Sequence, residues 1–281
     1  MEYNRIIRIN GNYVTVLYTK MYETVAKMVM QHYDNIQFRG NLFVINVLTD
    51  ENSNDIDFRG QCPGGIKYIY YQLQNLFLYP EYVIHEHMDQ FDEIWDFSIC
   101  NINYYDETLK EKVFFMPLRY VDIPKIEPQD NYKYDVGFIG TLTPYRQDEL
   151  SRITKYWTND FCKIKIISGY PYSELYDEIK DCKYLIDLPR KSDSGFILGC
   201  TRIFDALCSG KQVLVETFGW VENVFTWLVK PYDNIYKIHD MVKDDPIDNS
   251  EIFKQWTNTD ESYEYYRKQI MGDNYKQKLN L

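Results

Sequence analysis

The chain has 281 residues, of which 45% are hydrophobic and 26% charged, a composition typical of globular proteins and not of disordered or fibrous ones. Its net charge of −11 argues against nucleic acid as the expected partner, because proteins that hold nucleic-acid phosphates usually present a basic face. No apolar run approaches the ~20 residues of a membrane-spanning helix, and Met1–Arg5 lacks the features of a signal peptide. We therefore expect a soluble, cytoplasmic protein.

Short strand-like runs alternate with helix-like stretches in the first half of the chain. This alternation is typical of parallel sheets covered by helices, and so of the α/β class. The expected strands are Arg5–Ile9, Tyr13–Tyr18, Leu42–Leu48, Ile66–Tyr71 and Val113–Pro117, and the expected helix is Met21–His32.

A polar stretch with two prolines, Pro124 and Pro128, interrupts this pattern between residues 121 and 134. Such a composition indicates a linker between two domains. The alternation then resumes with expected strands at Tyr134–Ile139, Lys163–Ile167, Tyr184–Leu188 and Lys211–Glu216, and expected helices at Gln147–Trp157, Ser173–Asp181 and Thr201–Cys208. The remainder, from residue 217, has a mostly helical pattern.

The strand Tyr134–Ile139 runs through Gly137 into Gly140, and Arg146 follows near the start of the next helix. Glycine allows a close backbone approach to a ligand, and the first N–H groups of a helix attract phosphate. The spacing gives G-x-x-G, which is neither the dinucleotide fingerprint nor a Walker loop. A phosphate site and a plain strand-to-helix turn both remain open from this segment alone.

A second segment places Thr201, Arg202 and Asp205 in the first turns of a helix that ends at Gly210. The helix dipole and the guanidinium group both favour a diphosphate at this end of the helix. The Asp205 carboxylate has the chemistry to accept hydrogen bonds from ribose hydroxyls. An Arg–Asp pair on an amphipathic helix is the alternative explanation.

Together these two segments resemble the donor-binding half of GT-B glycosyltransferases, in which many members read Arg-x-Phe-Glu-Ala-Leu-x-x-Gly where this chain reads Arg202-Ile-Phe-Asp-Ala-Leu-Cys-Ser-Gly. The resemblance covers about residues 134–217. It implies two Rossmann-like domains facing a cleft, with C-terminal helices crossing back to the first domain. The implied parts are an acceptor-side domain at 1–122, a linker at 123–133, a nucleotide-sugar domain at 134–248 and C-terminal helices at 249–281.

The resemblance also implies roles for individual residues. Arg146 and Arg202 are expected to stabilise the leaving diphosphate, and Asp205 to hold the ribose. The expected donor-binding residues are Gly140, Thr141, Ser168, Gly169, Tyr170, Gly195, Thr201, Arg202 and Asp205. The catalytic base is not identified, and the weak candidates are Asp50, Glu86 and Asp89. No metal site is expected, because protein cations and helix dipoles usually carry the donor charge in this family.

The function implied by the resemblance is transfer of a hexosyl or pentosyl group from a nucleotide-diphosphate sugar, with UDP favoured, to an acceptor hydroxyl. The acidic charge favours a glycan, glycoprotein or small-molecule acceptor. Three alternatives remain open: glycosylation of a modified DNA base, a non-catalytic protein that binds nucleotides or sugars, and a dinucleotide oxidoreductase or methyltransferase on one Rossmann sheet, against which the missing glycine fingerprint counts. The abundant Tyr, Asn and Ile indicate an AT-rich coding genome, which fits a viral or phage-encoded protein acting in the host cytoplasm.

Overall fold

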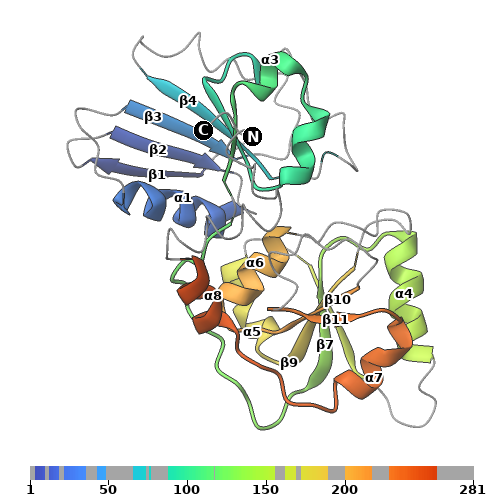
Figure 1. The fold of residues 1–281 in the computed structure, drawn as a ribbon. Helices are drawn as coiled ribbons and strands as arrows, with labels where there is room; N and C mark the ends of the chain where they lie inside the picture. Colours follow the sequence, from blue (N-terminus) through green and yellow to red (C-terminus); the bar gives the residue numbers. More distant parts are fainter. Residues whose placement is uncertain are drawn as a thin grey trace. The chain divides into compact units, whose positions relative to one another are not determined.

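The computed structural model describes residues 4–9, 13–18, 22–35, 43–48, 66–73, 76, 88–116, 118–155, 162–168, 172–188, 200–216 and 228–257. The chain divides into two units, Met1–Leu118 and Arg119–Leu281. Each unit contains its own predominantly parallel sheet with helices packed against it (Figure 1). The predicted α/β class with parallel sheets is therefore confirmed.

The sheet of the first unit has six strands that lie side by side in chain order. They are β1 (Asn4–Ile9), β2 (Tyr13–Tyr18), β3 (Phe43–Leu48), β4 (Lys67–Gln72), β5 (Glu93–Asp96) and β6 (Val113–Phe115). All neighbouring pairs are parallel except β1 and β2, which pair antiparallel in register from Asn4↔Tyr18 to Ile9↔Tyr13. The short connection between β1 and β2 requires this, because a parallel pair needs a crossover of a dozen or more residues.

Helix α1 (Glu23–Asn35) packs against β2 and buries Val25, Ala26 and Val29. These positions recur at the helical spacing of three and four residues, so one stripe of the helix faces the sheet. A second apolar cluster, rich in aromatic side chains, lies around β4, β5 and the short helices η3 (Ile99–Tyr104) and α3 (Glu107–Lys110). Tyr70 and Phe91 lie ring to ring there, with centroids 5.3 Å apart.

The second unit contains a five-stranded, fully parallel sheet in the order β11-β10-β9-β7-β8. Its strands are β7 (Tyr134–Ile139), β8 (Ile164–Ile167), β9 (Cys182–Asp187), β10 (Val213–Glu216) and β11 (Lys230–Tyr232). Its helices are α4 (Pro144–Lys155), η4 (Tyr172–Leu175), α5 (Tyr176–Ile179), α6 (Cys200–Cys208), η6 (Ile235–Lys237), α7 (Ile238–Met241) and α8 (Ser250–Thr257).

This strand order reverses direction once, between β7 and β9. The chain goes from β7 outward to β8, then returns across β7 to β9 and continues to β10 and β11. In doubly wound sheets of this kind, ligands bind at the carboxyl ends of the two strands where the order reverses. The topology therefore indicates the ends of β7 and β9 as the place to look for a site.

Alternate residues of these strands face opposite sides of the sheet. Val136 and Phe138 of β7 belong to the buried cluster that contains Leu150 and Ile153 of α4. Helix α6 covers the other side of the sheet and packs against α8 (Figure 1). The rings of Phe204 and Phe253 lie edge to face in this contact. The two faces are thus covered by helices that begin near the same edge of the sheet.

The segment that follows Leu118 packs within the second unit. Its backbone donates from Tyr120 to the side chain of Thr257, at 2.8 Å, and from Ile126 to the carbonyl of Ser209, at 2.8 Å. Residues 258–281, which include most of the expected C-terminal crossing helices, lie outside the described residues. In the part of the chain that is described, no helix is long and apolar enough to span a membrane.

Gly137 of β7 packs closely against β9. A Cβ atom added there would meet the Sγ atom of Cys182 at 2.7 Å and the side chain of Leu185 at 3.0 Å. Both neighbours are buried, so the core cannot accept the extra methyl group without moving.

We predict that Gly137→Ala lowers the free energy of unfolding by about 1–3 kcal/mol, the usual cost of overpacking a core. Urea unfolding followed by circular dichroism measures it. Adding Cys182→Ala in the double variant removes the clashing sulfur and should recover part of the loss. An undiminished stability of the single variant would contradict the close packing of β7 on β9.

Candidate functional site

The backbone at the end of β7 has a conformation that only glycine adopts readily. Gly140 has φ = +138°, and its N–H donates to the carbonyl of Ile167 at 3.2 Å, continuing the β7–β8 pairing by one residue. An L side chain at this φ is strained. Gly140 therefore turns the chain out of the sheet toward α4 at one of the two strands where the order reverses.

Arg146 is fixed at the start of α4. The helix begins at Pro144, whose lack of an N–H suits the first helical position, and the Thr143 side chain accepts from the Arg146 backbone N–H at 3.3 Å. The Arg146 side chain is only 2% exposed. Its guanidinium donates to the carbonyl of Leu188 from Nε (3.0 Å) and Nη2 (2.8 Å), and to the carbonyl of Thr141 from Nη1 (2.9 Å). It also lies over the ring of Phe138.

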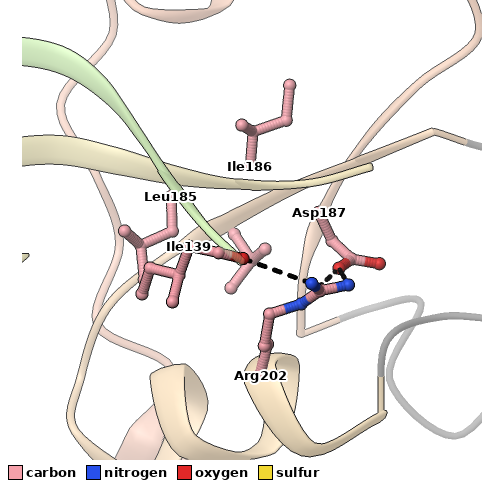
Figure 2. A pocket seen from close by; sticks show the side chains of 6 residues that line it. Ile139, Leu185, Ile186, Asp187 and Arg202 are labelled. Carbon is pink, nitrogen blue, oxygen red and sulfur yellow. Dashed lines mark hydrogen bonds and ion pairs between the residues drawn. The ribbon is translucent and has the colours of Figure 1, made fainter. Parts of the chain in front are cut away.

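Arg202 comes from the first turn of α6, on the other face of the sheet. Its Nε and Nη2 both contact Oδ1 of Asp187, at 3.1 and 2.7 Å, and its Nη1 donates to the carbonyl of Ile139 at 3.2 Å (Figure 2). These residues line a small pocket together with Leu185, Ile186 and Val213. Figure 2 shows the guanidinium extending from the helix across the ends of the strands toward Asp187.

The two guanidinium groups therefore approach Gly140 from opposite faces of the sheet. A Cβ atom on Gly140 would lie 2.7 Å from Nη1 of Arg202 and 3.7 Å from Nη1 of Arg146. A side chain at this position would therefore displace the Arg202 guanidinium, whereas its contact with Arg146 would be an ordinary one. The structure thus brings together three residues predicted from two separate segments, and it does so at the carboxyl ends of β7 and β9.

The remaining predicted donor residues are distributed as follows. Thr141 is exposed and follows Gly140, and Thr201 is half-buried beside Arg202 at the start of α6. Ser168 is exposed just after β8. Gly169, Tyr170 and Gly195 lie outside the described residues.

Asp205 is buried, with 6% exposure, on the inner face of α6. Burial raises the pKa of Tyr172 well above its ordinary value, and the nearby Asp205 carboxylate raises it further. Tyr172 opens η4 and donates or accepts a hydrogen bond at 3.1 Å with the hydroxyl of Ser209. The carboxylate predicted to hold ribose therefore lies close to the segment that follows β8, where the nucleobase is expected.

Two further carboxylates lie on the α4 side of the same edge. Glu216 ends β10, and its pKa is raised to about 7, chiefly by burial and secondarily by Glu149 of α4. Its Oε2 atom is buried and makes no hydrogen bond within the described part of the chain. Burial likewise raises the pKa of Glu149, although Arg152 at 3.1 Å opposes the rise. Burial and both glutamates raise the pKa of Tyr145 to about 12.

In the first unit, the carboxyl end of β5 carries a buried acid, Asp96. Its Oδ1 accepts from the Ser98 N–H (2.8 Å) and the Asn101 side chain (2.9 Å), and its Oδ2 accepts from the Tyr105 hydroxyl (2.7 Å). Asp96 is fully buried and organises the turn after the strand. Its environment is that of a structural carboxylate.

Of the weak candidates for a catalytic base, only Asp89 is described. It is exposed, pairs with Lys112 at 3.3 Å and precedes β5, so it lies at the amino ends of β5 and β6. Asp96 occupies the opposite edge. Asp50 and Glu86 lie outside the described residues. Across the described ranges, no group of three or more His, Cys, Asp or Glu side chains is placed to hold a metal ion.

Three acids at the two strand edges are not indicated by the sequence motifs: Asp187, Glu216 and Asp96. All three are the last residues of parallel strands. An acid that directly follows a buried apolar run is a recognisable signal, because the run ends where the sheet meets solvent or ligand.

Comparisons with known proteins find similarity only at the level of structure. No family model matches the chain, and no curated protein matches it by sequence. Among solved structures it is similar to the Gap123 glycosylation-associated protein complex of Streptococcus agalactiae (11% identity, TM-score 0.40, 92% of this chain and 57% of that one). It is also similar to S. aureus TarM solved with fondaparinux, α-GlcNAc-glycerol and UDP (12%, 0.41, 91% and 56%).

A third similar structure is T4 phage BGT in complex with UDP and Mn²⁺, at 10% identity and a TM-score of 0.43, covering 92% of this chain and 94% of that one. The chain spans little more than half the length of the first two. These neighbours are GT-B glycosyltransferases, the family that the sequence resembles. Because the identities are near one in ten, the functional inference rests on this chain's own residues.

Glu216 predicts a pH-dependent stability. Its pKa in the folded chain, about 7, exceeds its ordinary value of 4.5, so the folded state binds more protons than the unfolded state between these values. The protonated Glu216 therefore stabilises the fold at low pH, and this contribution is lost as pH rises through 7. Glu216→Gln should raise the melting temperature above that of the natural chain at pH 8 but not at pH 4.5.

Differential scanning fluorimetry across this pH range measures the effect. Glu251→Gln is the control, because the pKa of Glu251 is shifted in the opposite direction: the hydrogen bond from Lys125 lowers it. The melting temperature of this variant at pH 8 should therefore not exceed that of the natural chain. An equal rise in the melting temperature of Glu216→Gln at pH 8 and pH 4.5 would contradict a buried Glu216 that binds a proton on folding.

Proposed function

We propose that the chain is a glycosyltransferase that takes a sugar from a nucleotide-diphosphate donor, with UDP as the nucleotide, and transfers it to an acceptor hydroxyl. The observation that carries the proposal is the convergence of Arg146 and Arg202 on the bare backbone of Gly140. Two guanidinium groups at the sheet edge where the strand order reverses are suited to bind a diphosphate.

The same groups suit the chemistry of the transfer. Negative charge develops on the leaving diphosphate as the glycosidic bond breaks, and donors fixed in place before the reaction stabilise such charge best. Arg146 and Arg202 are held by the carbonyls of Thr141, Leu188 and Ile139. Protein cations are therefore available for the role that a divalent metal has in other transferases, and we expect donor binding to resist a chelator.

The position of Asp205 fits the nucleoside part of the donor. It lies one helical turn after Arg202 and beside Tyr172, which begins the structure after β8. A diphosphate at Gly140 would extend toward this carboxylate, which can accept hydrogen bonds from the two ribose hydroxyls. The proposed donor site thus runs along the start of α6.

For the acceptor we propose a hydroxyl of a glycan, a glycoprotein or a small molecule. The net charge of −11 disfavours a polyanionic duplex, because binding to phosphates is driven largely by the release of counterions from a basic surface. Incubation with a labelled UDP-sugar and a panel of acceptors tests this. Transfer to duplex DNA that weakens steeply with salt would instead favour glycosylation of a modified base, and tight UDP binding without transfer or hydrolysis would favour a non-catalytic binding protein.

Arg202→Gln tests the donor site directly. Glutamine keeps an amide that can donate to Asp187 but removes the charge and the fork, so we predict UDP binding weaker by about 2 kcal/mol, or roughly 30-fold. Isothermal titration calorimetry with UDP, with and without EDTA, measures it. Lys180→Gln is the matched control, since Lys180 is half exposed, pairs with Asp177 and precedes β9, at the opposite edge of the sheet.

Equal affinities for the Arg202→Gln variant and the natural chain would refute the proposed donor site. Thermal-shift titration with NAD and S-adenosylmethionine completes the test, because bound ligand raises the melting temperature. A rise in melting temperature with NAD or S-adenosylmethionine, and none with any nucleotide sugar, would instead favour a dinucleotide oxidoreductase or a methyltransferase.

A further inference from the structure

Asp187 holds Arg202 in an arrangement that leaves part of the guanidinium available. One oxygen, Oδ1, receives both Nε and Nη2, at 3.1 and 2.7 Å, while the carbonyl of Ile139 receives Nη1 at 3.2 Å (Figure 2). The Asp187 side chain is 6% exposed and that of Arg202 is 22% exposed. The accessible portion of the pair therefore belongs to the arginine.

A guanidinium group carries five N–H donors. Within the described part of the chain, the contacts of Arg202 use one on Nε, one on Nη1 and one on Nη2. One donor remains on each of the two terminal nitrogens. A pair of N–H groups on the terminal edge is the arrangement that binds two oxygens of a phosphate in bidentate fashion.

We infer that Asp187 is a positioning residue for the donor diphosphate: it orients Arg202 so that the terminal edge of the guanidinium faces the phosphate, without contacting the donor itself. This inference rests on the proposed function. Both anchors of Arg202, Asp187 and Ile139, are at the ends of neighbouring parallel strands, β9 and β7. The orientation is therefore set by the sheet before any ligand arrives.

The opposite role is that of a competitor, in which the Asp187 carboxylate stands in for the phosphate and must be displaced. The geometry favours positioning, because Asp187 contacts the Nε side of the guanidinium and the missing Cβ of Gly140 leaves space beside Nη1. The negative charge of Asp187 also repels a diphosphate. The orienting effect of Asp187 therefore strengthens diphosphate binding while its charge weakens it, and substitutions can separate the two effects.

Three substitutions make this separation. Asp187→Asn keeps an acceptor oxygen at the same place and removes the charge, so UDP should bind at least as tightly as to the natural chain. Asp187→Ala removes the anchor, and we expect about tenfold weaker binding of UDP. Asp187→Glu keeps the charge and the ion pair but moves the carboxylate oxygens by one methylene, so it should also weaken UDP binding. This variant tests the anchor if the alanine variant does not fold.

Isothermal titration calorimetry of the full chain with UDP, pyrophosphate and uridine measures these effects. A loss for UDP and pyrophosphate but not for uridine is expected, since Asp187 acts through a phosphate-binding group. Asp244→Asn is the matched control: it breaks an ion pair with Lys230 of 2.8 Å in the same unit, and UDP affinity should not change. Tighter UDP binding by the Ala and Glu variants would overturn positioning in favour of competition.

A double-mutant cycle with Arg202→Gln tests whether Asp187 acts through Arg202. Once Arg202 is replaced, Asp187→Ala should cause no further loss of UDP affinity, and an equal loss in both backgrounds would overturn the inference. The cycle also separates the two proposals. If Arg202→Gln itself leaves UDP binding intact, the proposed donor site fails; if it weakens binding and Asp187→Ala and Asp187→Glu do not, only the positioning role fails.

Discussion

The site depends on one constraint, the absence of a side chain at Gly140. Its φ of +138° turns the chain out of β7, and its missing Cβ leaves the space into which Nη1 of Arg202 extends, with Nη1 of Arg146 close by. Any other residue would meet the Arg202 guanidinium at 2.7 Å and strain the backbone at the same time. The position of Arg202 beside Arg146 at the sheet edge therefore depends on this glycine.

Electrostatics explains why two like charges can be held this close in a chain that is acidic overall. Each guanidinium donates to backbone carbonyls, whose partial negative charge offsets part of its own, and Arg202 is additionally paired with Asp187. The arrangement is then fixed by hydrogen bonds made before a ligand arrives. Donors held this way lose little entropy on binding an anion, which is the advantage of preorganisation.

Much of the fold could be predicted from the sequence. The strand at Tyr134–Ile139 and the helix at Thr201–Cys208 were placed to within a residue, because apolar runs bounded by glycine give clear patterns. Two strands were missed for physical reasons. Glu93–Asp96 has four residues with an acid at each end, and Lys230–Tyr232 contains a proline, which is tolerated because β11 is an edge strand.

Less of the site could be predicted. The two motifs identified Gly140, Arg146 and Arg202 as candidates, because glycine and arginine near helix starts have recognisable chemistry. Nothing in a local pattern shows that Arg146 binds the carbonyl of Leu188, 42 residues away, or that Arg202 pairs with Asp187. Such contacts depend on which strands become neighbours, and the order of β7 and β9 is a property of the whole sheet.

The end of β9 supplies the partners of both arginines from two consecutive residues. The Asp187 side chain reaches Arg202 on the α6 face, while the carbonyl of Leu188, the first residue after β9, receives Arg146 from α4. On the other strand, the carbonyls of Ile139 and Thr141 flank Gly140 in the same way. Two adjacent strand ends thus position a cation from each layer of helices, so the charge geometry of the site is a consequence of strand pairing.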